Sequence, residues 1–357
     1  MDTQQAGTID HDKLHAFMGK MVGDMSTAMS GALILIGDRL GLYKALAAGG
    51  AATPDELAKR TGTAERYVRE WLAAQAASGY VEYDPVTRRF AMTPEQAMAL
   101  ADETSPVYVS GAFEVIASAY IDEPKVTAAF RTGQGVGWHE HHECLFRGVE
   151  RFFRGGYSAF LVQNWIPALD GVQTKLASGA KAADVGCGHG ASTILMAKAF
   201  PKSSFIGFDF HAPSVERARA AAREAGIANA TFEVAKAKDF PGRDYDFIAC
   251  FDCLHDMGDP KGAAAHIRKA LRHDGNFMLV EPYANDDLKD NLNPVGRMYY
   301  SASTVICTPN SLSQEVGLGL GAQAGEARLR DVVMAAGFSR FRRATETPFN
   351  LILEARP

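Results

Sequence analysis

The sequence predicts an α/β protein whose C-terminal half is a doubly wound, mostly parallel sheet preceded by a helical region. Three observations predict this division. From Lys181 onward short apolar strands alternate with helical segments, a Gly-rich turn follows the first strand, and near the start apolar residues recur at helical spacing. The 357 residues are 47% hydrophobic with a formal charge of −5, which allows two or three domains and excludes a generally basic, nucleic-acid-coating protein.

Composition also bears on the compartment. The segment Met1–Lys13 is polar and lacks the apolar region of a secretory signal, and the apolar stretch Gly31–Gly37 is far too short to cross a membrane. The 5 cysteines are few and odd in number, so a disulfide framework is not expected. These features predict a cytoplasmic protein without a membrane segment.

Residues 1–50 are predicted to form a helical arm. Apolar residues recur at three- and four-residue steps from Leu14 to Tyr43, which predicts a long amphipathic helix broken near Gly31 or Gly37. Its Met-rich face can pack on the core of its own chain or against a second subunit. The second possibility predicts a homodimer.

Residues 51–102 are predicted to form a winged-helix domain. Thr53 opens a capping box for a helix that ends near Gly62, and Thr63 is expected to cap a second helix closing at Gly79. On the second helix one face is expected to carry Tyr67, Val68, Trp71 and Leu72. Two strands then flank Asp84-Pro85, and Thr93 caps the next helix.

This module is not expected to bind DNA. Between Thr53 and Leu100 it has six basic and seven acidic residues, a local net charge of −1. Nucleic-acid affinity depends mainly on a basic surface, so dimerisation or a scaffold role is the better prediction.

Residues 103–180 are predicted to form a helical connector that lines an acceptor pocket. The segment Trp138–Cys144 contains three His, two Glu and one Cys, but its spacing fits no standard zinc pattern, and no metal site is expected. The candidate substrate-binding residues here are Trp138, His141, His142 and Tyr157. The aromatic residues of this stretch suit core packing equally well.

The alternation of strands and helices begins at residue 181. The predicted strands are Ala182–Val185, Phe205–Phe208, Thr231–Val234, Phe247–Phe251 and Phe277–Val280. The predicted helices are Ser192–Ala199, Ser214–Ala225, Ala263–Leu271 and, last, Ala327–Ala336. This order is typical of βαβ units in a parallel sheet. Residues 283–325 are an insertion that we expect to act as a lid, with Arg297 and Tyr300 as candidate substrate contacts.

The Gly-rich turn is the most informative segment. It follows the first strand and contains the candidate ligand-binding residues Asp184, Gly186, Cys187, Gly188 and Gly190. Glycines there let a ligand approach the backbone at the switch point of the sheet, and the spacing also fits a degenerate dinucleotide fingerprint. A carboxylate at Asp184 would repel a pyrophosphate and favour an ammonium or sulfonium group. Asp209, with Phe210 beside it, ends the second strand and can accept both hydroxyls of a ribose.

The turn D-x-G-x-G-x-G together with the acidic end of the second strand resembles class I S-adenosylmethionine methyltransferases. The resemblance implies a Rossmann-like, seven-stranded sheet with its last strand antiparallel, over residues 181–357. It implies S-adenosylmethionine as cofactor and S-adenosylhomocysteine as product, with Phe251 and Asp252 bordering the cofactor. Many members have an acidic residue after the third strand; here the segment is Ala235–Asp239, so backbone near Ala237, or Asp239, would hold the adenine.

The fourth strand ends in Leu254-His255-Asp256, followed by Asp259. This segment resembles small-molecule O-methyltransferases with an N-terminal winged-helix domain, in which the corresponding His is the general base. A histidine beyond a strand end, with a pKa near neutrality, agrees with that role, although it could instead cap the following helix. Asp256 or Glu281 would orient the imidazole, and the sequence does not choose between them.

Nearly the whole chain also resembles a group of actinobacterial and proteobacterial winged-helix methyltransferases. The shared segments are Phe251–Pro260, Asn291–Gly296, Leu312–Gly317 and Glu346–Asn350. The resemblance implies methyl transfer to a small molecule and leaves the acceptor open.

The predicted function is methylation of a small-molecule oxygen with His255 as general base. S-methylation of a small thiol is the alternative, and a cofactor-sensing transcriptional regulator or a nicotinamide oxidoreductase is a weaker one. The pair Cys250 and Cys253 forms a C-x-x-C sequence, but it spans a strand end rather than a helix start, so redox activity is not expected.

Overall fold

The computed structural model describes residues 9–357, so the first eight residues of the predicted arm lie outside the described part. The chain divides into two compact units, one on each side of the boundary between Ile116 and Ala117, and each is described by itself. The boundary falls inside α6 (Ser110–Thr132), which contributes to both.

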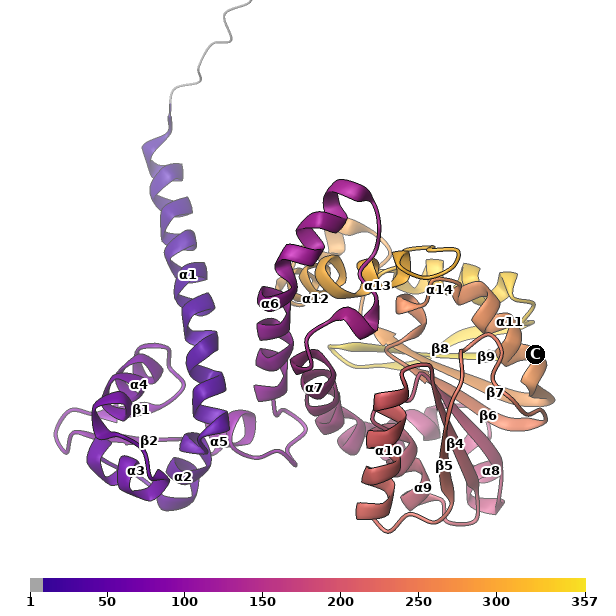
Figure 1. The fold of residues 1–357 in the computed structure, drawn as a ribbon, viewed down its shortest axis with the longest axis horizontal. Helices are drawn as coiled ribbons and strands as arrows, with labels where there is room; N and C mark the ends of the chain where they lie inside the picture. Colours follow the sequence, from indigo (N-terminus) through magenta and orange to yellow (C-terminus); the bar gives the residue numbers. More distant parts are fainter. Residues whose placement is uncertain (1–8) are drawn as a thin grey trace, which may run out of the picture. The chain divides into compact units, whose positions relative to one another are not determined.

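The first unit is a small helical domain with a two-stranded hairpin (Figure 1). Its elements are α1 (His11–Arg39), α2 (Leu42–Gly49), α3 (Pro54–Thr61), α4 (Glu65–Ala77), β1 (Glu82–Asp84), β2 (Arg89–Ala91) and α5 (Pro94–Leu100). The capping boxes expected at Thr53 and Thr93 are both present. One core unites these elements, and among its fully buried members are Ile34, Leu42, Leu57 and Leu72.

The predicted break in the first helix is wrong. Helix α1 runs without interruption through Gly31 and Gly37, and the chain turns only at Gly41, whose φ is 68°. Close packing explains why position 37 of the helix is a glycine: a Cβ there would lie 2.6 Å from ring atoms of both Trp71 and Tyr43. The glycine permits close approach between helices and does not end one.

Two details of the second predicted helix also differ. The N-cap of α4 is Ala64, not Thr63. The Thr63 hydroxyl instead forms a hydrogen bond of 2.8 Å with the Thr61 hydroxyl. Val68, Trp71 and Leu72 are buried as expected, but Tyr67 is 81% exposed. The buried residues of α4 are Val68, Trp71, Leu72 and Gln75, and Tyr67 lies at the edge of their stripe, about 100° from Val68 and about 40° from Trp71.

The second unit combines a large sheet with many helices. Ahead of the sheet lie α6, η1 (Trp138–Glu140), α7 (Cys144–Phe160), η2 (Leu161–Trp165), η3 (Ile166–Ala168) and α8 (Val172–Ser178). Between and after the strands lie α9 (Ala191–Ala199), α10 (Ala212–Glu224), η4 (Leu254–Asp256), α11 (Pro260–Ala270), η5 (Leu288–Asn291), α12 (Pro294–Ala302), η6 (Ser303–Cys307), α13 (Thr308–Leu312) and α14 (Gly325–Ala335). The predicted insertion is therefore mostly helical.

The sheet has seven strands in the order β5-β4-β3-β6-β7-β9-β8. Its strands are β3 (Lys181–Val185), β4 (Ser204–Asp209), β5 (Ala230–Val234), β6 (Tyr245–Phe251), β7 (Leu271–Pro282), β8 (Arg340–Glu346) and β9 (Asn350–Arg356). The pairs from β5 to β7 are parallel, and β9 is antiparallel to both neighbours. The α/β prediction with an antiparallel last strand is confirmed.

Helices cover both faces of this sheet (Figure 1). One core packs β3, β6 and β7 against α11 and α14, and the other packs them against η2, α8 and α9. Because both faces are buried, the central strands are apolar throughout rather than alternating. Within residues 9–357, none of the helices has the length and apolar character that crossing a membrane requires.

Candidate functional site

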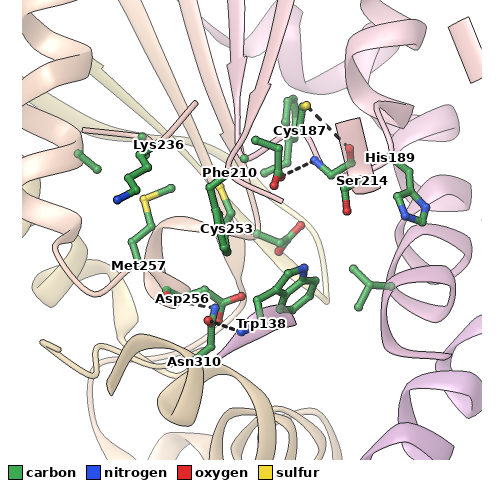
Figure 2. A pocket seen from close by; sticks show the side chains of 18 of the residues that line it. Trp138, Cys187, His189, Phe210, Ser214, Lys236, Cys253, Asp256, Met257 and Asn310 are labelled. Atoms are coloured by element: carbon green, nitrogen blue, oxygen red, sulfur yellow. Dashed lines mark hydrogen bonds between the residues drawn. The ribbon is translucent and has the colours of Figure 1, made fainter. Parts of the chain in front are cut away.

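A cavity of about 360 Å³ opens at the carboxyl ends of the central strands. Residues directly after β3, β4 and β6 line it, among them Gly186, Phe210 and Asp252. Strand order reverses between β3 and β6, and ligands of open α/β sheets bind at such a switch point. Figure 2 shows side chains from this strand-end edge converging on one space with Trp138 and Asn310.

The Gly-rich turn forms one wall of the cavity. Gly186 has a φ of 81°, and a Cβ there would lie 2.6 Å from the Cys253 Sγ atom. Gly186, Cys187 and Gly188 line the cavity as predicted, so a ligand can approach this backbone closely. Gly190 is not among the described lining residues, since it packs against Phe232 below the turn.

Asp184 lies beneath the turn rather than at the mouth of the cavity. Its Oδ2 accepts hydrogen bonds of 2.6 Å from the hydroxyls of Ser192 and Thr193, whereas its Oδ1 is buried with no hydrogen-bond partner among residues 9–357. Burial raises the pKa of Asp184 to about 6. Asp184 is not among the described lining residues, whereas its partner Ser192 is, so the ammonium contact of Asp184 stays a prediction.

Asp209 ends β4 and lines the cavity. Backbone amides hold its carboxylate: Gly188 donates to Oδ2 at 2.9 Å and His211 donates to Oδ1 at 2.8 Å. Burial raises the pKa of Asp209 despite these bonds. The neighbouring Phe210 and, from the next strand end, Ala237 also line the cavity. A fixed carboxylate between apolar walls suits the hydroxyls of a nucleoside.

Asp252 occupies the end of β6 with a φ of 49°, an unusual backbone conformation for a non-glycine residue. Its side chain accepts hydrogen bonds from the Tyr157 hydroxyl at 2.7 Å and from the Asn350 amide at 2.8 Å. Burial raises the pKa of Asp252 to about 7. Asp252, Tyr157 and Phe251 all line the cavity. The sequence predicted Asp252 as a cofactor contact and Tyr157 as a substrate contact.

His255 lies directly behind the cavity wall. It is 3% exposed; its Nδ1 pairs with the Glu281 carboxylate, and its Nε2 is 3.2 Å from Asp256 Oδ1. Both predicted orienting residues therefore contact the imidazole, one on each ring nitrogen. The possibility that His255 caps the next helix is wrong, because the Asp259 side chain caps α11.

The environment of His255 favours its charged form. Burial disfavours an imidazolium, but the carboxylates of Glu281 and Asp256 outweigh this effect and raise the pKa of His255 well above its usual value. Asp256 lines the cavity, whereas His255 and Glu281 are not among the described lining residues. Cys307 completes the surroundings, and burial raises the pKa of its thiol to about 12.

Four predicted substrate contacts lie away from the cavity lining. His141 is buried and pairs through Nδ1 with Asp122 at 3.2 Å, and the backbone of His142 donates to the same carboxylate at 2.8 Å. Arg297 and Tyr300 lie on α12. Among the described lining residues only Trp138 and Tyr157 come from the predicted substrate set.

Several lining residues have no counterpart in the sequence-based prediction. Those from the turn and the strand ends are His189, Ser192, Lys236, Cys253 and Met257, and those from the insertion are Asn310, Gln314 and Glu315. Position next to a predicted motif could have indicated the first set. In the second set, Gln314 and Glu315 fall inside the shared segment Leu312–Gly317, whereas no local pattern indicates Asn310.

Comparison with protein-family models agrees with this architecture. Residues 176–324 match a methyltransferase domain. Residues 28–102 match an Rv2258c-like winged HTH domain. The chain carries a methyltransferase domain behind a winged-helix domain. The expected class I methyltransferase fold and winged-helix N-terminus are thereby confirmed.

Curated relatives match only part of the chain. The chain is 30% identical over 119 residues to an uncharacterized methyltransferase of Bacillus subtilis, covering 32% of this chain and 46% of that protein. It is 29% identical over 116 residues to a tRNA (guanine-N(7)-)-methyltransferase of Vibrio cholerae, with the same coverage. The chain thus spans about half the length of the curated relatives it matches.

Solved structures resemble the whole chain in fold. A putative O-methyltransferase of Nostoc punctiforme has a TM-score of 0.72 at 21% identity, covering 95% of this chain and 98% of that one. Human N-acetylserotonin methyltransferase, solved with S-adenosylmethionine, has a TM-score of 0.71 at 14% identity and covers 99% of each chain. At these identities the likeness is one of fold.

Proposed function

We propose that this protein is an S-adenosylmethionine-dependent methyltransferase that methylates an oxygen atom of a small molecule. One observation carries the proposal: a single cavity is lined by the Gly-rich turn and Asp209 on one side and by Asp256 on another. The Asp256 carboxylate contacts the buried His255. The names of the structural neighbours, which include O-methyltransferases, support oxygen as the target.

The cofactor-binding role rests on the strand-end residues. When bound, S-adenosylmethionine supplies a methyl group already activated on a sulfonium. Gly186, Cys187 and Gly188 would accept the amino-acid part against their backbone, Asp209 would accept the ribose hydroxyls, and Phe210 and Ala237 would border the adenine. A cationic ligand nearby would favour the charged forms of Asp184 and Asp252, whose pKa values burial raises to about 6 and about 7.

The chain's own contribution to transfer is positioning, water exclusion and proton removal. Trp138 and Tyr157 would hold a flat acceptor between the Gly-rich turn and Asp256. His255 would take the acceptor's proton at Nε2, the nitrogen beside the cavity-lining Asp256, with Glu281 on Nδ1 fixing the ring and stabilising the resulting imidazolium. A base of this kind suits a phenol or an enol.

A small thiol is the alternative acceptor. A thiolate forms more readily than a phenolate and is the stronger nucleophile, so it depends less on a general base. We place this alternative second because a buried histidine between two carboxylates would be of little use to it.

We propose a second copy of this chain as the partner of α1. Between residues 14 and 29 this helix exposes large apolar side chains, namely Leu14, Phe17, Met18, Val22, Met25 and Met29. A row of this length on one helix is characteristic of an interface with another protein. The acidic balance of the winged-helix domain argues against DNA as that partner.

Turnover with a panel of acceptors tests the proposed function. Purified protein is incubated with S-adenosylmethionine and phenols, carboxylates, amines or small thiols, and S-adenosylhomocysteine release is followed. Turnover on an oxygen acceptor supports the proposal, and turnover only on thiols favours the alternative. The proposal would be overturned if no acceptor were methylated and if NAD, rather than S-adenosylmethionine, raised the melting temperature in a thermal-shift assay.

A further inference from the structure

The loop that carries His255 and Asp256 is held by a distant part of the chain. Every backbone carbonyl from His255 to Gly258 accepts a hydrogen bond from the segment 310–321 of the insertion. Gly321 N–H donates to the His255 carbonyl at 3.3 Å, and Leu318 N–H donates to that of Gly258 at 2.9 Å. The Ser311 hydroxyl donates to the Met257 carbonyl at 2.8 Å.

Two side-chain amides complete this set at Asp256. Gln314 donates from Nε2 to the Asp256 carbonyl at 3.0 Å and accepts from the Gly258 N–H at 3.0 Å. Asn310 donates from Nδ2 to the same Asp256 carbonyl at 3.3 Å. Each amide thus fixes the residue whose carboxylate lies 3.2 Å from His255 Nε2.

Asn310 also reaches the opposite wall of the cavity. Its Oδ1 accepts a hydrogen bond of 3.1 Å from the Trp138 backbone, and Figure 2 shows it between Trp138 and Asp256. Nearby, the Val136 N–H donates to the Pro309 carbonyl at 3.0 Å. Both Asn310 and Gln314 line the cavity, and Asn310 is 4% exposed.

We propose that Asn310 and Gln314 are positioning residues that set Asp256 and His255 against the acceptor held by Trp138. The inference rests on the proposed function. Loss of either donor would let the loop 255–258 shift relative to Trp138, and a misplacement of about 1 Å between reacting groups can cost on the order of 100-fold in rate. The cofactor side of the cavity would be little affected, because Asp209 and the Gly-rich turn make no use of these amides.

The matched variants are Asn310→Asp and Gln314→Glu. Each keeps the acceptor oxygen, for Trp138 N–H and Gly258 N–H respectively, and replaces the donor facing the Asp256 carbonyl with a repelling oxygen. The control is Asn293→Asp, since exposed Asn293 likewise accepts from Gly296 N–H at 2.9 Å and donates to the Asp290 carbonyl at 3.1 Å.

We expect kcat to fall roughly 10- to 100-fold in both variants, with the Kd for S-adenosylmethionine and all constants of Asn293→Asp within about 2-fold of wild type. An unchanged kcat in a folded variant would overturn the inference. A Kd for S-adenosylmethionine that weakens in proportion to kcat would also overturn it, because the amides would then support the whole cavity rather than the loop.

A second measurement separates this inference from the proposed function and covers variants that fail to fold. Gln314→Met removes the hydrogen bonds to the Gly258 N–H and the Asp256 carbonyl, together with those from Nε2 to Asn310, without adding charge. Hydrogen–deuterium exchange of the peptide containing Gly258 is then compared with wild type in the presence of S-adenosylmethionine alone. We expect faster exchange in Gln314→Met and no change in Asn293→Asp. Equal exchange in Gln314→Met and wild type would contradict the inference even if no acceptor had been found.

Discussion

At the scale of single residues, the chemistry depends on an imidazole held between two carboxylates. The sequence predicted His255 and named Asp256 and Glu281 as its possible partners, and the fold uses both. It could not predict Asn310, because that side chain meets Trp138 across 172 positions and Asp256 across 54. Such contacts follow from tertiary packing and leave no local pattern.

The pH dependence of turnover is the first prediction at this scale. His255 must be neutral to accept a proton, and its pKa is raised well above 6.5 by Glu281 and Asp256, which outweigh burial. We therefore expect kcat to rise with pH, with a midpoint above 6.5. In Glu281→Gln one negative charge is lost, so the midpoint should move to lower pH. If the midpoint is the same in Glu281→Gln and wild type, the rise of kcat with pH does not report the titration of His255, which would contradict the assignment.

At the scale of elements, apolar runs and helix-capping residues predicted the strands and helices most reliably. Five predicted strands lie where the sheet has β3 to β7. Burial on both faces makes the central strands apolar, whereas at the sheet edge β5 buries only Phe232. The break predicted in α1 failed because a glycine can mark either a helix end or a close contact. Gly37 makes a close contact, with Trp71 and Tyr43 against its Cα.

This distinction predicts opposite effects for two glycines of α1. Gly37→Ala introduces a Cβ 2.6 Å from two rings and should destabilise the first unit by about 1–3 kcal/mol through overpacking. Gly23→Ala meets no described atom within 4 Å and should stabilise the same helix by up to about 1 kcal/mol. Denaturant unfolding of the full chain measures both. Equal effects would show that Gly37 has no special packing role.

At the scale of the whole molecule, the first unit presents an apolar helix face and the second contains the cavity. The capping and strand signals of the sequence indicated a winged-helix module, and its local charge indicated that it does not bind DNA; the family comparison confirms the winged-helix domain. The partner that we propose for α1 is a second copy of the chain, and a single chain does not contain that contact.

The proposed homodimer predicts a change in mass on substitution of that face. Met25 and Met29 are 54% and 76% exposed, and Met25→Lys with Met29→Lys should shift the sedimentation of the protein from dimer to monomer. Thr27→Lys adds a single lysine on the opposite side of the helix, about 200° away from both methionines, and should leave the dimer intact. A wild-type protein that sediments as a monomer at all concentrations would contradict the proposal.

The most direct test of the central claim is the rate of oxygen methylation by His255→Ala. We predict a loss of about 100- to 10,000-fold in kcat, because general-base catalysis contributes that much, with the Kd for S-adenosylmethionine preserved and a smaller loss on a thiol acceptor. The preserved Kd shows that the variant is folded around its cofactor. Oxygen methylation at a nearly unchanged rate in His255→Ala would contradict the account.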